Sequence, residues 1–286
     1  MSALPEGREG PEAVPVTVIE PVSATGRLPV AEIWANRRFL VLMVRRAVQA
    51  RYKDTFLGVF WAIAQPLSYM LVLNLFFGVV ARFSAPDIPY PLFLFCGLVP
   101  YQFFSRCAVE GAASIRGNAE LVNKVYVPRM LLPLSTVGTI MVDFLVAFGL
   151  LVLMALFYQV APTMNLIALP LLFLLLFAAG VSMAIGLSVA TVYYHDLRVG
   201  VPVVMQMWFF ATPIIYPASR VPEAWQVWYG LNPMVSVVEL FRWCLLGTAS
   251  LPDTRVLAVS VATILTVLLI SLHFFRKLES NVADRV

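Results

Sequence analysis

Few side chains in this chain could do chemistry, and they do not form a recognisable catalytic set. The sequence contains no G-x-x-x-x-G-K-[ST] loop for phosphate, and no H-E-x-x-H or G-x-S-x-G motif for a metal or a nucleophile. The run His195-Asp196-Leu197-Arg198 has a catalytic appearance, but it is more typical of a polar turn that joins two helices. We therefore expect no catalytic residues, no metal site and no cofactor bound by this chain.

One acid lies deep inside a long apolar segment. Asp143 is the only charged residue between Leu131 and Val160. An ionised carboxylate within a membrane is costly, so such a residue usually has a function or a partner. Three interpretations stay open: an ion pair with Arg106, hydrogen bonds from serine and threonine on neighbouring helices, or a protonated carboxyl with a structural role.

The elements that must position these residues are long and apolar. The chain is 60% hydrophobic and only 13% charged, which is too few charges for the surface of a soluble domain. A membrane-crossing helix needs about 20 apolar residues, and continuous apolar blocks favour helices over the alternating strands of a barrel. The sequence thus predicts an all-α integral membrane protein. Its six transmembrane helices are expected near residues 55–81, 90–113, 131–158, 166–193, 199–217 and 255–275.

The positive charges indicate an orientation for these spans. With the N-terminus in the cytoplasm, 15 Lys and Arg residues fall in predicted cytoplasmic segments and 4 fall outside, as the positive-inside rule requires. Both termini are then cytoplasmic, and the net charge of +4 reflects topology rather than a nucleic-acid partner. Residues 1–30 are Pro-rich and are predicted to be a flexible tail, whereas residues 31–286 form one membrane domain.

Residues 31–50 are amphipathic, with arginines on one arc and apolar side chains on the other. A helix with this pattern lies in the membrane interface, where its cations face anionic headgroups. In the alternative, the same cations meet an anionic substrate that arrives from the inner leaflet. Arg37, and Arg51 just after this segment, fall on the apolar arc and would have to snorkel. The residues expected to act in substrate access are Arg37, Arg38, Arg45 and Arg46.

The predicted cytoplasmic loop after residue 113 contains a short helix that Asn118 can cap and that Pro128 ends. Glu120 lies in its first turn, where the helix dipole favours an acid. Four residues share an apolar face by helical spacing, and docking into a groove of a soluble partner would bury them. The alternative is that this face packs back onto the spans. The four residues are Leu121, Val122, Val125 and Tyr126.

Residues 218–254, which include the hairpin predicted at 218–250, do not form another clean span, because Pro222, Pro252 and a Gly-Leu-Asn-Pro break divide the region into short pieces. Segments of about 10–14 apolar residues usually re-enter or lie at the interface. We therefore predict a re-entrant helical hairpin on the periplasmic side; the alternative is an extracytoplasmic loop with a surface helix. The hairpin residues of interest are Trp225, Trp228, Glu239 and Arg242.

Several motifs in a fixed order resemble the ABC-2 type permeases that export polysaccharides. The resemblance covers about residues 33–280, and it is greatest to the O-antigen and teichoic-acid branch of that family. The motifs are RYKDTFLG at 51–58, followed by Trp61 and Pro66, LFLFCGLVPYQFF at 92–104, LVNKVYVPRMLLPLS at 121–135, YHDLR at 194–198, FFATPIIYP at 209–217 and LNPMVSVVELFRW at 231–243.

This resemblance implies a permease subunit without enzymatic activity, forming a homodimer with two copies of a separate ATPase that binds ATP and magnesium. It implies that 121–126 is the helix that couples to the ATPase, that 31–49 is a gate helix and that 222–246 is the hairpin near the exit. It also implies a translocation path between the protomers, lined mainly by the first and fifth spans. The aromatic residues on those spans that we expect to line the path are Tyr69, Phe76, Phe77, Trp208, Phe209 and Tyr216.

The function that follows is ATP-driven export of a polysaccharide (O-antigen, capsule or a related lipid-linked glycan) across the bacterial cytoplasmic membrane, in contact with membrane lipids. Sequence leaves open which glycan is carried, and whether a polyprenyl carrier travels with it. An ABC-2 permease for a drug or small lipid is the alternative. A membrane enzyme would need a cluster of acids or a histidine at an aqueous edge, and a channel would need a filter motif, and neither is found in the sequence.

Overall fold

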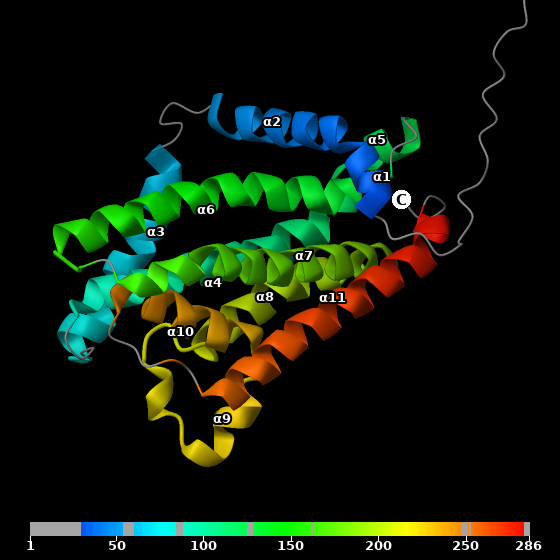
Figure 1. Ribbon diagram of the computed structural model, residues 1–286. Coiled ribbons are helices and arrows are strands. Elements are labelled where there is room, and N and C mark those ends of the chain that lie inside the picture. The colour runs from blue at the N-terminus through cyan, green and yellow to red at the C-terminus, as the bar shows by residue number, and fades with distance from the viewer. Residues whose placement is uncertain are drawn as a thin grey trace, which may run out of the picture.

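The computed structural model describes residues 30–53, 60–83, 88–124, 128–161, 163–247, 251 and 253–282. Every regular element within these ranges is helical, which confirms the all-α class (Figure 1). Residues 1–29 of the predicted tail and residues 54–59, at the start of the first predicted span, lie outside the described residues.

Within the described residues, five apolar helices are long enough to cross a membrane, and they correspond to five of the six predicted spans. The first is α3 (Phe60–Leu73), which continues as the π-helix η1 (Asn74–Val80). The others are α4 (Tyr90–Gly117), α6 (Leu131–Phe157), the 3-10 turn η2 (Met164–Ala168) with α7 (Leu169–Tyr193), and α11 (Thr254–Val282).

The helix at the position of the predicted fifth span is shorter. α8 (Leu197–Phe210) has 14 residues, or about 21 Å at about 1.5 Å per residue, whereas the hydrocarbon core is about 30 Å thick. The sequence gives a reason, since Pro213 and Pro217 cannot donate the backbone hydrogen bonds that would continue the helix. The count of six crossings therefore stays a prediction.

α4 forms the centre of the bundle. In its most apolar stretch 78% of the residues are buried, against 11–33% in the other long helices. α7 and α6 both pack against it. Small residues allow the close contact with α7, because a Cβ atom added to Gly111 would lie 2.5 Å from the Cα atom of Ala184.

An N-terminal pair of helices, α1 (Val30–Ala35) and α2 (Arg37–Lys53), precedes the bundle. α2 packs along α6, with Val44 against Gly138, where an added Cβ would lie 2.7 Å from the Val44 side chain. Figure 1 shows α2 running beside α6. This adds a feature that the sequence did not predict, namely contact between the end of α2 and the middle of a span. The position of α2 relative to a membrane surface stays a prediction.

After α8 the chain forms the 3-10 turn η3 (Ala218–Arg220) and two short helices, α9 (Glu223–Tyr229) and α10 (Pro233–Leu246). The side chain of Asn232 caps α10 by accepting a 3.0 Å hydrogen bond from the Met234 amide, and Gly247 ends it with a left-handed φ of 66°. α10 is mostly buried against α4, α7 and α11, whereas α9 projects away from the bundle (Figure 1).

Candidate functional site

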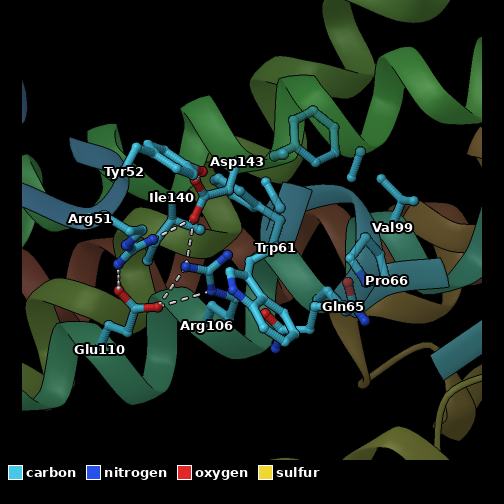
Figure 2. Close-up of a pocket in the computed structure, with 15 residues that line it drawn as sticks. Arg51, Tyr52, Trp61, Gln65, Pro66, Val99, Arg106, Glu110, Ile140 and Asp143 are labelled. Carbon is cyan, nitrogen blue, oxygen red and sulfur yellow. Dashed lines mark hydrogen bonds and ion pairs between the residues drawn. The ribbon is translucent and has the colours of Figure 1, made fainter. Parts of the chain in front are cut away.

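A cluster of charged and hydroxyl side chains lies where α2, α4 and α6 meet; we call Arg51, Tyr52, Arg106, Glu110 and Asp143 the charged cluster. Nη2 of Arg106 lies 2.7 Å from Oδ2 of Asp143 and 2.9 Å from Oε1 of Glu110. Nη2 of Arg51 lies 2.9 Å from Oε2 of Glu110, and its Nη1 donates to Asp143. Figure 2 shows the two guanidinium groups bridging the two carboxylates.

The position of Asp143 explains why the cluster needs several cations. Asp143 is only 7% exposed, and it lies about 18 Å along α6 from its first residue, at about 1.5 Å per residue. A buried carboxylate requires paired charge and hydrogen bonds. Arg51 and Arg106 supply the charge, and two acids against two arginines leave no net charge.

Tyr52 completes the shell of Asp143 by donating its hydroxyl hydrogen to the carboxylate. Burial, followed by that hydrogen bond, raises the pKa of Tyr52 to about 12. The phenol therefore stays protonated near neutral pH and remains a donor. Of the three interpretations left open for Asp143, the structure supports the ion pair with Arg106.

Beside the charged cluster lies a cavity of about 390 Å³ between α2, α3, α4 and α6. This volume falls within the range of about 300–1,000 Å³ that is usual for small-molecule sites. The charged cluster forms one wall and α3 contributes Trp61, Gln65 and Pro66 (Figure 2). Gln102 on α4 lines the cavity as well.

The arginines predicted to act in substrate access lie outside this cavity. Arg37, Arg38, Arg45 and Arg46 are all exposed on α2. Arg37 donates to the carbonyl of Trp34 at 3.0 Å and stacks over its ring at 5.1 Å. The arginine of α2 that enters the site is Arg51, which the amphipathic pattern marked only as a side chain that must snorkel.

The predicted coupling segment begins with α5 (Ala119–Lys124), which follows directly on α4. Glu120 is exposed in its first turn, and Leu121 is partly buried against the core. Val125 and Tyr126 lie outside the described residues, as does the side chain of Val122. The docking role of this face stays a prediction.

Polar contacts connect the neighbouring ends of α4 and α7. The side chain of Asn118 donates to the carbonyl of Ser114 at 2.7 Å and so closes α4. Arg116 donates to the carbonyl of Val192 and lies 2.9 Å from Nδ1 of His195. His195 and Asp196 thus form a turn between α7 and α8, and Leu197 and Arg198 begin α8.

The predicted path aromatics fall into two groups. On α3 and η1, Tyr69 and Phe76 are 57% and 59% exposed. The other four are partly buried, and three of them pack on rings within the bundle. Those three contacts are Phe77 with Phe83, Trp208 with Phe104, and Phe209 with Tyr101.

The hydroxyl of Tyr216, the remaining path aromatic, lies 3.0 Å from that of Tyr229 on α9. Burial raises the pKa of Tyr229, and the hydrogen bond with Tyr216 adds to this effect. The contact joins the segment after α8 to the hairpin.

The predicted hairpin residues differ in how far their side chains are exposed. Trp225 and Trp228 on α9 are 63% and 67% exposed, as belt residues would be. Arg242 is 1% exposed, donates to Glu239 at 2.9 Å and to the carbonyl of Ile214 at 2.8 Å, and lies 3.5 Å over the ring of Phe93.

Glu239 in turn accepts from the backbone amide of Ala218 at 3.2 Å. The i, i+3 spacing of the two charges indicates their ion pair. The bonds of the pair to Ile214 and Ala218 fix α10 to the segment that follows α8.

Within the described residues no group of three or more His, Cys, Asp or Glu side chains could hold a metal ion. Sequence reasoning missed Glu110 and Tyr52 as site residues. The signal that could have found Glu110 is its spacing of four from Arg106 on one helix face. No comparable signal pointed to Tyr52, whose partner Asp143 lies 91 residues further along the chain.

Comparison with known proteins extends these observations. The chain matches the family described as ABC-2 type transporter over residues 38–246, a range that includes the whole charged cluster. It is 30% identical over 259 residues to the O-antigen export system permease protein RfbA of Myxococcus xanthus, covering 90% of this chain and 98% of the relative.

Other relatives carry related names. An O-antigen export system permease protein RfbA of Klebsiella pneumoniae is 30% identical over 251 residues, covering 86% of this chain and 93% of the relative. The polysialic acid transport protein KpsM of Escherichia coli is 26% identical over 202 residues, covering 69% of this chain and 77% of the relative.

Proposed function

Because the chain belongs to the ABC-2 type transporter family, we propose that it is the permease subunit of an ATP-driven exporter that moves a polysaccharide across the bacterial cytoplasmic membrane. One observation carries this proposal: the likeness to an O-antigen export permease extends over 98% of that protein's length. The five long apolar helices agree with a membrane-embedded transport subunit.

The energy for export is expected to come from a separate ATPase subunit. The sequence has no phosphate-binding loop, and α5 connects α4 to α6 on the side predicted to be cytoplasmic. In the proposed complex two copies of this chain pair with two ATPase subunits. Closure of the ATPases would push on the segment around α5 and, through α4, on the centre of the bundle.

The proposed substrate suits the exposed aromatic side chains of the first span. A polysaccharide presents hydroxyl groups and apolar C–H faces, and aromatic rings can hold such faces weakly at many positions. Tyr69 and Phe76 are exposed on α3 and η1. In a homodimer whose two protomers face each other across this helix, these rings would line the shared path.

A deletion strain tests the proposal. We expect deletion of the gene to remove the polysaccharide from the cell surface and to trap it in the cytoplasm, and we expect the gene on a plasmid to restore export. Because polymer synthesis is separate from export, the total amount of polymer per cell should change little, whereas the fraction at the cell surface should fall. A surface polysaccharide that is unchanged in amount and composition would contradict the proposal.

A further inference from the structure

The wall of the cavity beside the charged cluster combines polar side chains with apolar ones. Its lining includes the amide side chains of Gln65 and Gln102, the indole of Trp61 and the charged cluster. No hydrogen bond joins either glutamine amide to the described part of the chain. Each amide can donate two hydrogen bonds and accept two, so both are available to a ligand in the cavity.

The charges of the cavity favour a neutral ligand. The guanidinium groups of Arg51 and Arg106 are already paired with Glu110 and Asp143 at hydrogen-bonding distance. A phosphate would have to displace a carboxylate and leave that acid unpaired, which is costly in a partly buried site. A hydroxyl group can instead donate to a carboxylate and accept from a guanidinium without breaking either pair.

The aromatic wall adds an apolar surface next to these polar groups. Trp61 is 56% exposed although it lines the cavity, so much of its side chain is available for contact. Figure 2 shows Trp61 and Gln65 on the same helix, beside Arg106. A ligand with both hydroxyl groups and an apolar face matches this wall, and a sugar ring has both.

The position of the cavity connects it to the first span's exposed face. Trp61, Gln65 and Tyr69 lie at positions i, i+4 and i+8, and therefore share one side of α3. All three are exposed. A chain that contacts Tyr69 can thus extend along the same helix face to the cavity.

From these observations we propose that the cavity binds one sugar residue of a neutral glycan, with Trp61 under the ring and with Gln65 and Gln102 bound to its hydroxyl groups. This inference rests on the proposed function and adds to it a defined sugar subsite inside each protomer. The subsite is separate from the predicted path aromatics and from the exposed arginines of α2.

Cysteine labelling of the permease–ATPase complex in lipid nanodiscs tests binding directly. Ala62 lines the cavity and can be replaced by cysteine, and the three native cysteines of this chain are buried, so Ala62→Cys provides one accessible thiol in each permease copy, which is resolved from the ATPase by gel electrophoresis. A mannose hexasaccharide is the probe. At about ten times its Kd it should slow maleimide labelling about tenfold.

Further variants and a second probe identify which groups are responsible for the protection by the hexasaccharide. Adding Trp61→Ala should raise the half-protecting concentration of hexasaccharide about tenfold, equivalent to about 1.4 kcal/mol, whereas Trp61→Tyr should retain most of the protection. Phe274→Ala removes a similarly exposed ring (54%) from α11 and should leave protection unchanged. Inorganic pyrophosphate should not protect the thiol.

Several results would overturn the inference. They are a thiol at position 62 that never reacts, labelling that the hexasaccharide does not slow, equal protection in Trp61→Ala, or protection by pyrophosphate alone. Failure of the proposed function would be seen separately, because export by the unmodified chain in the complemented deletion strain does not depend on the labelling result.

Discussion

Removal of Arg106 should destabilise the bundle unless one acid is neutralised at the same time. Arg106 contacts both Asp143 and Glu110, and its loss leaves two carboxylates with Arg51 alone. Breaking a fully buried ion pair costs about 3–5 kcal/mol. The side chains of Arg106 and Glu110 are 31% and 30% exposed, so solvent screening lowers our expectation for Arg106→Gln to about 2–3 kcal/mol.

The double variant is the informative one. In Arg106→Gln with Asp143→Asn, the Arg51–Glu110 pair at 2.9 Å remains and no charge is left without a partner. We therefore expect the double variant to be at least as stable as Arg106→Gln, although two polar groups have been changed. Arg198→Gln, an exposed arginine after the turn at His195, serves as the matched control and should change stability little.

Thermal unfolding of the purified protein in detergent measures the difference. A change of 1 kcal/mol moves the midpoint by about 2–4 °C in proteins of roughly this size, so Arg106→Gln should unfold several degrees below the parent. Additive losses, with the double variant as unstable as the sum of the two single variants, would show that the charged cluster does not act as one network.

Three other changes test separate parts of the structure. Arg242→Met removes a fully buried cation that Glu239 and a backbone carbonyl hold, and should cost about 3–5 kcal/mol of unfolding free energy, seen as a lower unfolding midpoint. Leu121→Asp with Val125→Asp should abolish co-purification of the ATPase while membrane insertion remains normal. Gly111→Ala places a methyl group 2.5 Å from the Cα atom of the facing residue of α7 and should cost about 1–3 kcal/mol in the same unfolding assay.

Each of these has a clear contrary result. Parent-like unfolding of Arg242→Met would mean that the buried pair does not fix α10. Co-purification of the ATPase with the Leu121→Asp, Val125→Asp variant would contradict the predicted coupling role of the segment around α5. Unchanged stability of Gly111→Ala would show that α4 and α7 do not depend on their close contact.

Local composition was enough to predict most of the long apolar helices. The apolar run that predicted a helix at 131–158 corresponds to α6, which ends at Phe157, and the run at 166–193 corresponds to η2 and α7. Such runs suffice because backbone hydrogen bonds in a helix are local and lipid supplies none. The predicted span at 199–217 extends beyond α8, which ends at Phe210, because hydrophobicity alone does not register the two prolines, Pro213 and Pro217, that cannot continue the helix.

The site was less accessible to sequence reasoning because it is built from distant segments. Arg51 and Asp143 are 92 residues apart, and the contact depends on α2 packing along α6. Hydrophobic periodicity describes the faces of a helix but not the direction in which it lies against its neighbours. The pair of Arg106 with Asp143 could be anticipated only as one of three alternatives, because a buried acid needs a partner but the sequence does not say which.

ATP-dependent movement of glycan across the membrane tests the central claim most directly. Inverted membrane vesicles that contain this chain and its ATPase, and that carry radiolabelled glycan made on their outer face, should move the label into the lumen when ATP is added. Lumenal label should fall to background without ATP or without this chain. Equal lumenal label in vesicles that lack the chain would contradict the account.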